Sequence, residues 1–469
     1  MSRAAGRVVG VLRGLLARPL TSYHLLLACT GLLLVIGLTM VFSATSVHAY
    51  ATDGSAFAAI AEQATYAMFG LGAFWVCQRL PARTFRALAL PLLIGAFVLQ
   101  GLLDGLALLA RADLLAEPQL GPLVADTRWL RFGGLSIQPS ELVKFALVVW
   151  AADLLARKGA LAARWRELSR PLFPVAGLLL LMVGYQDLGT MLSMLVLFVG
   201  ILWAAGVRLR VFAGMALVVL GGVGMLVVAQ SSYRMERLTA FLNPDCDVLD
   251  ECYQSMQART ALADGGWFGV GLGNASGKWG WLPEGHNDFI FAVIGEELGV
   301  VGSLVVLALF AVFAYTALRI ARRVPDRFRR LAAAGVAAWI VGQTVINIGG
   351  VIGLLPITGL PLPFISAGGS ALVVTLAAVG MLVSFARVEP GAAKALHARP
   401  PARWVQLFWA PLPPLPREPA DRAPGGRREP AGRQQPAGGS TSSRRAVRGG
   451  PPGARGGAPR SDSPPRPRT

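Results

Sequence analysis

The sequence predicts an all-α, polytopic integral membrane protein with about ten transmembrane helices. Of its 469 residues, 54% are hydrophobic and only 15% are charged, which is far too apolar for a soluble enzyme of this length. Apolar runs of roughly 20 residues, enough to cross a hydrocarbon core of about 30 Å, recur along the first four fifths of the chain. The net charge of +18 is spread unevenly, with arginines in alternate connections between these runs.

The arginine-rich connections predict which side of the membrane each loop occupies. Arginines precede the first span and lie between the second and third, fourth and fifth, sixth and seventh, and eighth and ninth spans. Such basic segments stay in the cytoplasm, so both termini are predicted to be cytoplasmic. No small-residue cleavage site follows the N-terminal arginines, and the first span is therefore expected to be a retained anchor. The spans are expected to begin near Tyr23, Ala61, Ala87, Pro139, Leu172, Leu188, Val211, His286, Leu331 and Ser366.

Composition divides the chain into a basic cytoplasmic arm (residues 1–20), a transmembrane domain (21–388) and a segment rich in Pro, Gly and Arg (389–469). The last segment cannot bury a core and is predicted to be a disordered cytoplasmic tail. Within it, Trp404, Phe408 and Trp409 beside Arg403 fit two interpretations. They rest at the headgroup layer, with the following arginines attracted to anionic lipid, or they belong to a solvated linker.

The fourth span opens with the polar stretch QPSELVK, residues 138–144. Pro139 suits the first turn of a helix, and Glu141 and Lys144 then share one helical face. An internal ion pair that lets both charges enter the membrane explains this spacing. A Lys144 that also faces a cavity would attract a phosphate group, and the two interpretations are compatible.

The apolar stretch that begins at Pro171 is interrupted at residues 185–190, YQDLGT. The run up to Gly184 would rise only about 21 Å as a helix, which is shorter than the bilayer core. The interruption is therefore expected to lie below the outer surface. Asp187 either caps the following helix or lines a binding site there.

The longest external segment is predicted at about residues 230–285, between the seventh and eighth spans. Its glycine run, GGWFGVGLGNASGKWGW, has the wrong spacing for a dinucleotide turn or a P-loop. It indicates instead backbone that approaches a ligand or a lipid headgroup closely. Cys246 and Cys252 are expected to form a local disulfide in an oxidising exterior, with a cation site among the acidic residues between them as the alternative.

The connection before the tenth span, GLLPITGLPLPFISAGGSAL, mixes Pro and Gly with apolar residues. Irregular backbone at membrane depth has to be buried in protein or line a wet cavity. This connection is therefore expected to fold back into the external mouth of the protein.

The eighth span begins in PEGHNDFIFAVIGEELG, which holds four carboxylates and a histidine. Asp288 either caps this helix or, facing an external cavity, acts as a general base. Glu296 and Glu297 lie about 12 Å deeper and are predicted to make structural hydrogen bonds in the protein interior. His286 and Asp288 lack the further ligands of a zinc site. A divalent cation such as Mg²⁺ or Mn²⁺, held by carboxylate and diphosphate oxygens, would suit the chemistry better, but the sequence establishes none.

Five stretches of the chain, in this order, resemble the FtsW/RodA (SEDS) family of bacterial peptidoglycan glycosyltransferases, over roughly residues 19–388. They are RWL…GG…QPSELVK, DLGT, YRMERLTAFLNP, LPEGHNDFIFAVIGEELG and LLPITGLPLPFISAGGS. IGEELG and GLPLPFIS resemble the division-associated FtsW branch, and the basic start and long tail resemble its actinobacterial members. Asn287 and Gly285 depart from the usual residues, and Tyr185 and Gln186 replace a pair that includes a proline.

The resemblance implies polymerisation of lipid II, an undecaprenyl-diphosphate-linked disaccharide-pentapeptide, at the outer face of the cytoplasmic membrane. Asp288 then matches the catalytic base, which deprotonates the 4-hydroxyl of the acceptor sugar for an inverting attack on the donor. Lys144 and Arg237 are expected to position the diphosphate or the substrate. The supporting positions are Gln138, Ser140, Glu141, Asp187, Glu284, His286, Asn287, Glu297 and Ser366.

The family also implies a partner, a class B penicillin-binding protein that cross-links the new glycan, together with other divisome membrane proteins at the division septum. No nucleic-acid partner is expected. Two other functions fit the sequence. A flippase that moves lipid II without polymerising it would place its polar site near the midplane rather than at the outer mouth. A non-enzymatic divisome scaffold would leave Asp288 and Lys144 without a purpose.

Overall fold

The computed structural model describes residue 14 and residues 18–55, 57–112, 119–126, 128–132, 135–159, 170–229, 252–276 and 281–415. Arg237, Cys246 and the part of the predicted tail after residue 415 lie outside the described residues. Residues 417–469 form a unit separate from residues 1–416.

The described residues are mostly helical, and the helices begin close to the predicted span starts. The long apolar helices are α2 (Thr21–Asp53), α3 (Ala58–Arg79), α4 (Ala82–Arg111), α5 (Pro139–Lys158), α7 (Leu172–Gln186), α8 (Leu188–Ala204), α9 (Leu209–Ala229), α12 (Ile290–Arg323), α13 (Arg327–Val351) and α14 (Gly369–Ala386). Shorter helices are α11 (Tyr253–Asp264), α15 (Pro390–Ala398) and α16 (Arg403–Phe408). Within the described ranges, five helices are long and apolar enough to cross a membrane, in α2, α4, α12, α13 and α14. The protein is therefore a helical membrane protein, and the count of ten spans stays a prediction.

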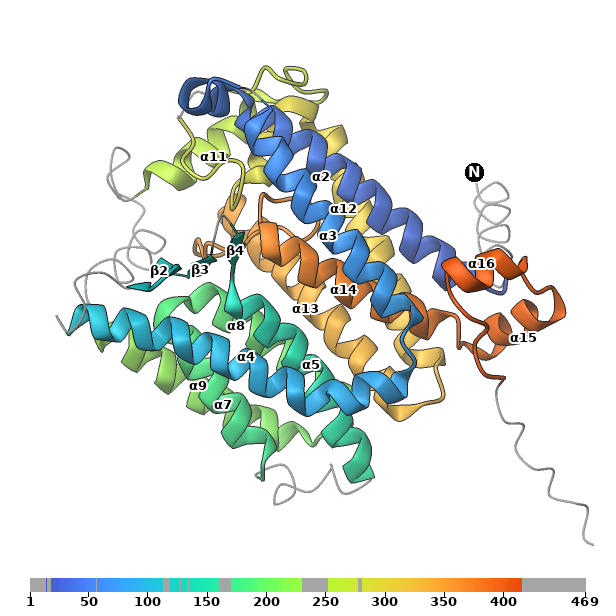
Figure 1. Ribbon diagram of the computed structural model, residues 1–469. Helices are drawn as coiled ribbons and strands as arrows, with labels where there is room; N and C mark the ends of the chain where they lie inside the picture. The colour runs from blue at the N-terminus through green and yellow to red at the C-terminus, as the bar shows by residue number, and fades with distance from the viewer. Residues whose placement is uncertain are drawn as a thin grey trace, which may run out of the picture. The chain divides into compact units, whose positions relative to one another are not determined.

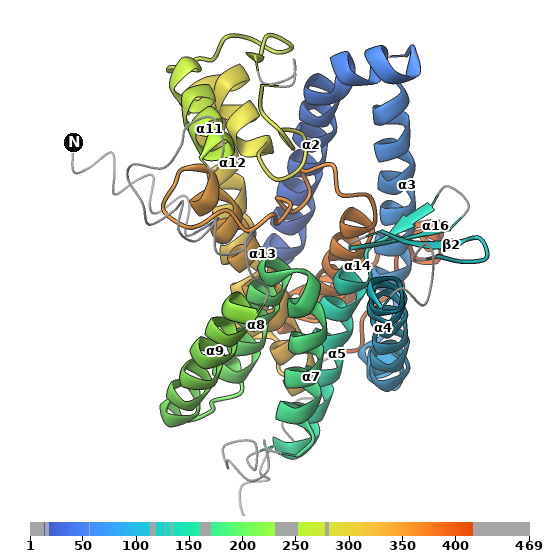
Figure 2. The same cartoon turned by 90° about the vertical axis from the view of Figure 1, so that its left-hand side faces the viewer.

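Helix α13 lies at the centre of the helical unit and joins two groups of helices (Figures 1 and 2). It contacts α5 and α8 on one side and α12 on the other, while α3 packs on α14 and α2 packs on α12. Small residues allow this close packing. A Cβ added to Gly335 would lie 2.7 Å from a side-chain carbon of Ile201, and one added to Gly342 would lie 2.5 Å from Val196.

A small antiparallel sheet between α4 and α5 corrects the all-α prediction. Its strands are β1 (Gln119–Leu120), β2 (Leu123–Asp126), β3 (Trp129–Phe132) and β4 (Leu135–Ile137), in the order β1-β2-β3-β4. Ala125 lies opposite Leu130 in the register, and both pack on Leu103 and Leu106 of α4. Strands of two to four residues are too short for a readable alternation, so the packing against α4 decides the structure here.

Helix α12 consists of two helical segments that meet at Gly299, whose φ of 68° is left-handed. The glycine run of residues 265–271 satisfies the backbone groups that this break releases. Val270 and Gly271 donate to the carbonyls of Glu296 and Glu297, at 2.9 and 3.1 Å. In return, Val300 and Val301 donate to the carbonyls of Gly266 and Trp267, at 3.0 and 3.2 Å. The close approach predicted for this run is thus to the chain's own α12.

The run needs glycine because any side chain would meet the backbone of α12. A Cβ on Gly265 would overlap the carbonyl of Gly295, and one on Gly269 would overlap that of Glu297. The two deep carboxylates complete this attachment. Glu297, fully buried, accepts from the Ser43 hydroxyl at 2.6 and 2.8 Å, and Glu296 accepts from the Ser276 amide and hydroxyl at 2.6 and 2.7 Å.

Residues 389–415 differ from the predicted disordered tail, because they form α15 and α16 and contact the ends of the membrane helices. Arg387 donates to the carbonyls of Ala410 and Pro411, at 3.2 and 2.8 Å. Composition alone misplaces this boundary, since the contacts come from single arginine and tryptophan side chains rather than from an apolar run.

Candidate functional site

The turn that leads into α12 holds Asp288, and its backbone is fixed from two directions. The Asn347 side chain, on α13, donates to the carbonyls of Asp288 and Leu360 at 2.7 and 2.6 Å. The Ser366 hydroxyl donates to the carbonyl of Asn287 at 2.7 Å and accepts from the Leu362 amide at 2.6 Å. The segment of Asp288 is therefore tied to the connection between α13 and α14.

Arg128 lies beside Asp288 and was not singled out from the sequence. It occupies the two-residue turn between β2 and β3 and donates to the carbonyl of Gly359 at 3.2 Å. A Cβ added to Gly359 would lie 3.2 Å from Arg128 Nη1 and 3.3 Å from Asp288 Oδ2. Glycine thus leaves room for the guanidinium and the carboxylate to border the same small space. The stretch RWL, which contains Arg128, was the available signal.

Asp187 joins the same group of charges from the break between α7 and α8. Its carboxylate caps α8 by accepting from the amide and the hydroxyl of Thr190, at 3.0 and 2.9 Å. The oxygen that meets the hydroxyl also lies 3.4 Å from Arg128 Nη1. The cap and the site are therefore one structure, in which Arg128 lies between Asp187 and the space beside Asp288.

Lys144 lies inside the bundle rather than on a cavity wall. Its ammonium is 2.7 Å from Glu141 Oε1, and the two side chains are 0% and 1% exposed. It also donates to Gln343 Oε1 at 2.8 Å and lies 5.1 Å from the centre of the Trp339 ring. Gln343 in turn donates to the carbonyl of Pro361 at 2.8 Å, so the ion pair supports the connection that holds Asp288. Lys144 is not among the described residues that line the cavities near Asp288.

The other predicted residues take supporting positions. Gln138 precedes α5, and its backbone amide donates to the Ser370 hydroxyl at 2.9 Å. Ser140 is buried in the first turn of α5. Glu284 is exposed, with a left-handed φ of 57°, and its carboxylate accepts from the Asn287 side chain at 3.4 Å. Cys252 is disulfide-bonded, whereas its predicted partner Cys246, like Arg237, lies outside the described residues.

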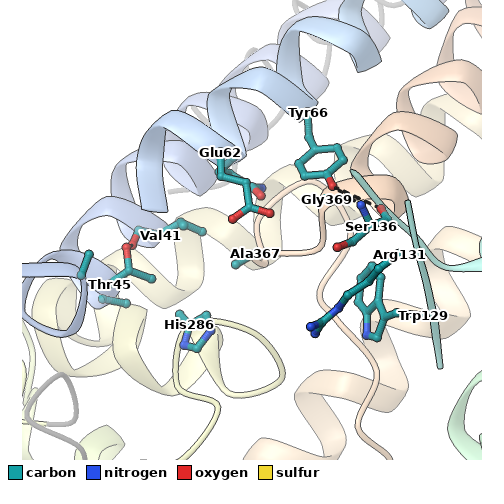
Figure 3. Close-up of a pocket in the computed structure, with 13 residues that line it drawn as sticks. Val41, Thr45, Glu62, Tyr66, Trp129, Arg131, Ser136, His286, Ala367 and Gly369 are labelled. Atoms are coloured by element: carbon teal, nitrogen blue, oxygen red, sulfur yellow. Dashed lines mark hydrogen bonds between the residues drawn. The ribbon is translucent and has the colours of Figure 1, made fainter. Parts of the chain in front are cut away.

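A cavity of about 400 Å³ is lined in part by His286, two residues before Asp288 (Figure 3). Figure 3 shows Glu62, Arg131 and His286 directed toward a common space, with Trp129 beside Arg131. Tyr66 forms part of the cavity wall. Its ring is held in place by a hydrogen bond in which its hydroxyl accepts from the Ser136 backbone amide at 2.9 Å. An indole, charged groups of both signs and hydroxyls suit a polar, hydroxyl-rich ligand such as a sugar.

The described residues do not form a metal site of their own. No group of three His, Cys, Asp or Glu side chains within the described ranges could hold an ion. Beside Gly359, the Arg128 guanidinium borders the same space as the Asp288 carboxylate and already supplies positive charge there. The divalent cation suggested near Asp288 stays a prediction, and it would depend on oxygens of the substrate.

Comparison with known proteins gives consistent matches. The FTSW_RODA_SPOVE family model, described as cell cycle protein, matches residues 23–390. A Mycobacterium tuberculosis protein named probable peptidoglycan glycosyltransferase FtsW is 42% identical over 401 residues, or 85% of this chain and 74% of the relative. A chain of a peptidoglycan synthase complex that coordinates polymerization and crosslinking has a TM-score of 0.60 at 23% identity, over 78% of this chain and 97% of that chain. The rod shape determining protein RodA of Thermus thermophilus has a TM-score of 0.53 at 26% identity, over 78% and 96%.

Proposed function

This chain belongs to the FTSW_RODA_SPOVE family of cell cycle proteins, and we propose that it is a peptidoglycan glycosyltransferase that polymerises lipid II at the outer face of the cytoplasmic membrane. The observation that carries the proposal is the placement of Asp288. Its backbone is held by Asn347, and its carboxylate borders the same space as the Arg128 guanidinium. The name of the mycobacterial relative supports the same reaction, and its branch supports a role in septal wall synthesis.

In the proposed reaction, Asp288 accepts the proton of the acceptor sugar's 4-hydroxyl. The resulting oxygen nucleophile attacks the anomeric carbon of the donor sugar. A new glycosidic bond forms as the bond between that carbon and the diphosphate oxygen breaks. Undecaprenyl diphosphate leaves with the bonding electron pair, and the anomeric configuration inverts. Holding the carboxylate in advance lowers the entropic cost of this encounter.

Arg128 is proposed to bind the leaving diphosphate. A guanidinium can donate two parallel hydrogen bonds to phosphate oxygens and compensates the negative charge that develops on them. Asp187 keeps Arg128 in place at 3.4 Å while it also caps α8. The Arg237 of the large external segment is proposed to act in the same way.

Lys144 and Glu141 are proposed to position the site rather than to touch substrate. Their charges compensate each other in the interior, and Gln343 transmits their placement to the carbonyl of Pro361. The cavity with Trp129, Glu62 and His286 is proposed to receive a sugar of the substrate, because it adjoins the segment that carries Asp288.

Ten helices are proposed to span the membrane, with both termini in the cytoplasm: α2, α3, α4, α5, α7, α8, α9, α12, α13 and α14. This arrangement puts the Asp288 turn on the outer side. A class B penicillin-binding protein is the proposed partner, as supported by the similarity to a chain of a peptidoglycan synthase complex. Other divisome proteins are proposed to bring the pair to the septum.

The test is glycan-strand formation from labelled lipid II by the purified chain with its transpeptidase partner. Asp288→Asn should abolish polymer while leaving the thermal unfolding midpoint and partner binding unchanged. Asp264→Asn is the matched control, because this aspartate is exposed at the end of α11 and lies outside the proposed site. Equal polymerisation by the native chain and Asp288→Asn would refute the catalytic role. Transfer of lipid II across vesicles without polymer would favour a flippase.

A further inference from the structure

The chain after α14 forms a strap, here residues 403–411, across one end of the helical unit. Figure 1 shows α15 and α16 beside the end of α2. The Trp409 indole donates to the Tyr23 hydroxyl at 2.5 Å, and the Trp75 indole donates to the carbonyl of Phe408 at 2.6 Å. Arg79 donates to the carbonyl of Leu407. The backbone of the strap is thus fixed to α2 and α3 at the ends of these helices.

The strap turns an apolar face away from the protein. Trp404, Leu407 and Phe408 stand at positions i, i+3 and i+4 of α16, so they share one side of the helix. Their exposures are 68%, 67% and 65%. Three large apolar side chains held in this way need a covering surface, because leaving them in water forgoes the free energy of their burial.

This face continues the lipid-facing surface of α3. Helix α3 packs on α2 and α14, and its remaining face exposes Leu71, Trp75 and Val76. Trp75 and Arg79, one turn apart on α3, are the residues that hold the strap. The strap therefore crosses α3 where its apolar face ends and its last, basic residue begins, which is the level of the lipid headgroups.

The charge around the strap is positive. Arg399 and Arg403 are both exposed, just before and at the start of α16. An apolar helical face flanked by arginines is typical of helices that lie in a membrane interface and attract anionic lipid.

We propose that the strap binds the membrane leaflet on its own side, which the arginines predict to be the cytoplasmic one. Trp404, Leu407 and Phe408 enter the boundary between headgroups and acyl chains, and Arg399 and Arg403 contact anionic phospholipid. The inference does not depend on the glycosyltransferase activity. Its consequence is that membrane composition decides whether the last described segment stays attached to the bilayer.

The test uses the full chain in nanodiscs of phosphatidylcholine, with or without phosphatidylglycerol. Trp404 is monitored by quenching with brominated lipids, as the difference between the native chain and Trp404→Phe. Trypsin cleavage after Arg403 gives a second measurement. With phosphatidylglycerol, we expect Trp404 to be quenched by bromines near the headgroups and the Arg403–Trp404 bond to be protected.

A Leu407→Glu/Phe408→Glu double variant should lose both the quenching and the protection. Leu415→Glu is the matched control, because Leu415 is similarly exposed, at 55%, but lies outside α16. An unquenched Trp404 with rapid cleavage in every nanodisc would overturn the proposal and favour a protein partner for this face. Equal quenching and protection without phosphatidylglycerol would overturn the requirement for anionic lipid.

Discussion

The buried pair of Glu141 and Lys144 predicts a large difference between removing one charge and removing both. The ammonium and carboxylate are 2.7 Å apart and essentially unexposed. In Lys144→Met, the Glu141 carboxylate would stay in the interior, where its oxygens have no further hydrogen-bond partner among the described residues. Breaking a buried pair in this way costs about 3–5 kcal/mol, whereas replacing both partners by apolar residues is often neutral.

The double variant Glu141→Met/Lys144→Met should therefore have a thermal unfolding midpoint close to that of the native chain. The midpoint of Lys144→Met should be well below both. Gln343 creates no new unsatisfied group in the double variant, because its carbonyl oxygen still accepts from the Trp339 indole at 2.9 Å. Thermal unfolding in detergent of the native chain, both single variants and the double variant completes a double-mutant cycle and gives the order of their stabilities. Lipid II polymerisation is measured in parallel.

Two results would refute this reasoning. A double variant as unstable as Lys144→Met would mean that the ion pair is not what the lysine is needed for. A Lys144→Met variant as stable as the native chain would mean that the unpaired Glu141 carboxylate costs nothing in the interior.

Three other changes test separate parts of the structure. Gly269→Ala should prevent the loop from docking on α12, because the added Cβ would overlap the backbone of Glu297. Gly273 has the same left-handed backbone but open space around it, so Gly273→Ala should lower the free energy of unfolding by only about 1–2 kcal/mol. Equal unfolding midpoints for the two variants would contradict the role of the docking. Arg128→Lys keeps the charge but loses the planar guanidinium that can donate two parallel hydrogen bonds. The rate of polymerisation should therefore fall about 10²-fold or more at an unchanged unfolding midpoint. Full activity of this variant would show that Arg128 does not act in the site. Burial raises the pKa of Glu389 above 4.5 despite the opposing charges of Arg319 and Arg323. The folded state therefore binds this proton more tightly, so the stability it adds is present below pH 4.5 and is lost as pH rises through the raised pKa. Glu389→Gln should flatten the pH dependence of the melting temperature in that range, and an unchanged dependence would assign it to another group.

The positions of the helices follow from the sequence because they depend on local patterns. An apolar run of sufficient length can satisfy its backbone groups in a membrane only as a helix, so the starts near Pro139, Leu172 and Leu188 could be predicted. The candidate aspartate could be proposed too, since a carboxylate at the start of an apolar helix stands out against its surroundings.

The partners of these groups depend on contacts between distant parts of the chain. Arg128 reaches the space beside Asp288 through a sheet whose strands are too short to read from a pattern, and through a glycine at position 359. The glycine run docks on α12 because a break at Gly299 releases backbone groups that only another segment can satisfy.

The sequence by itself therefore determined a helical membrane protein with charges at particular points along its helices. Only the tertiary structure decided which charges meet. It buried Lys144 against Glu141 inside the bundle and brought Arg128 between Asp187 and the space beside Asp288. The physical reason is that apolar length and helical periodicity are local and act over a few turns. An ion pair, or a set of backbone hydrogen bonds between two segments, depends instead on where the whole chain places its two partners.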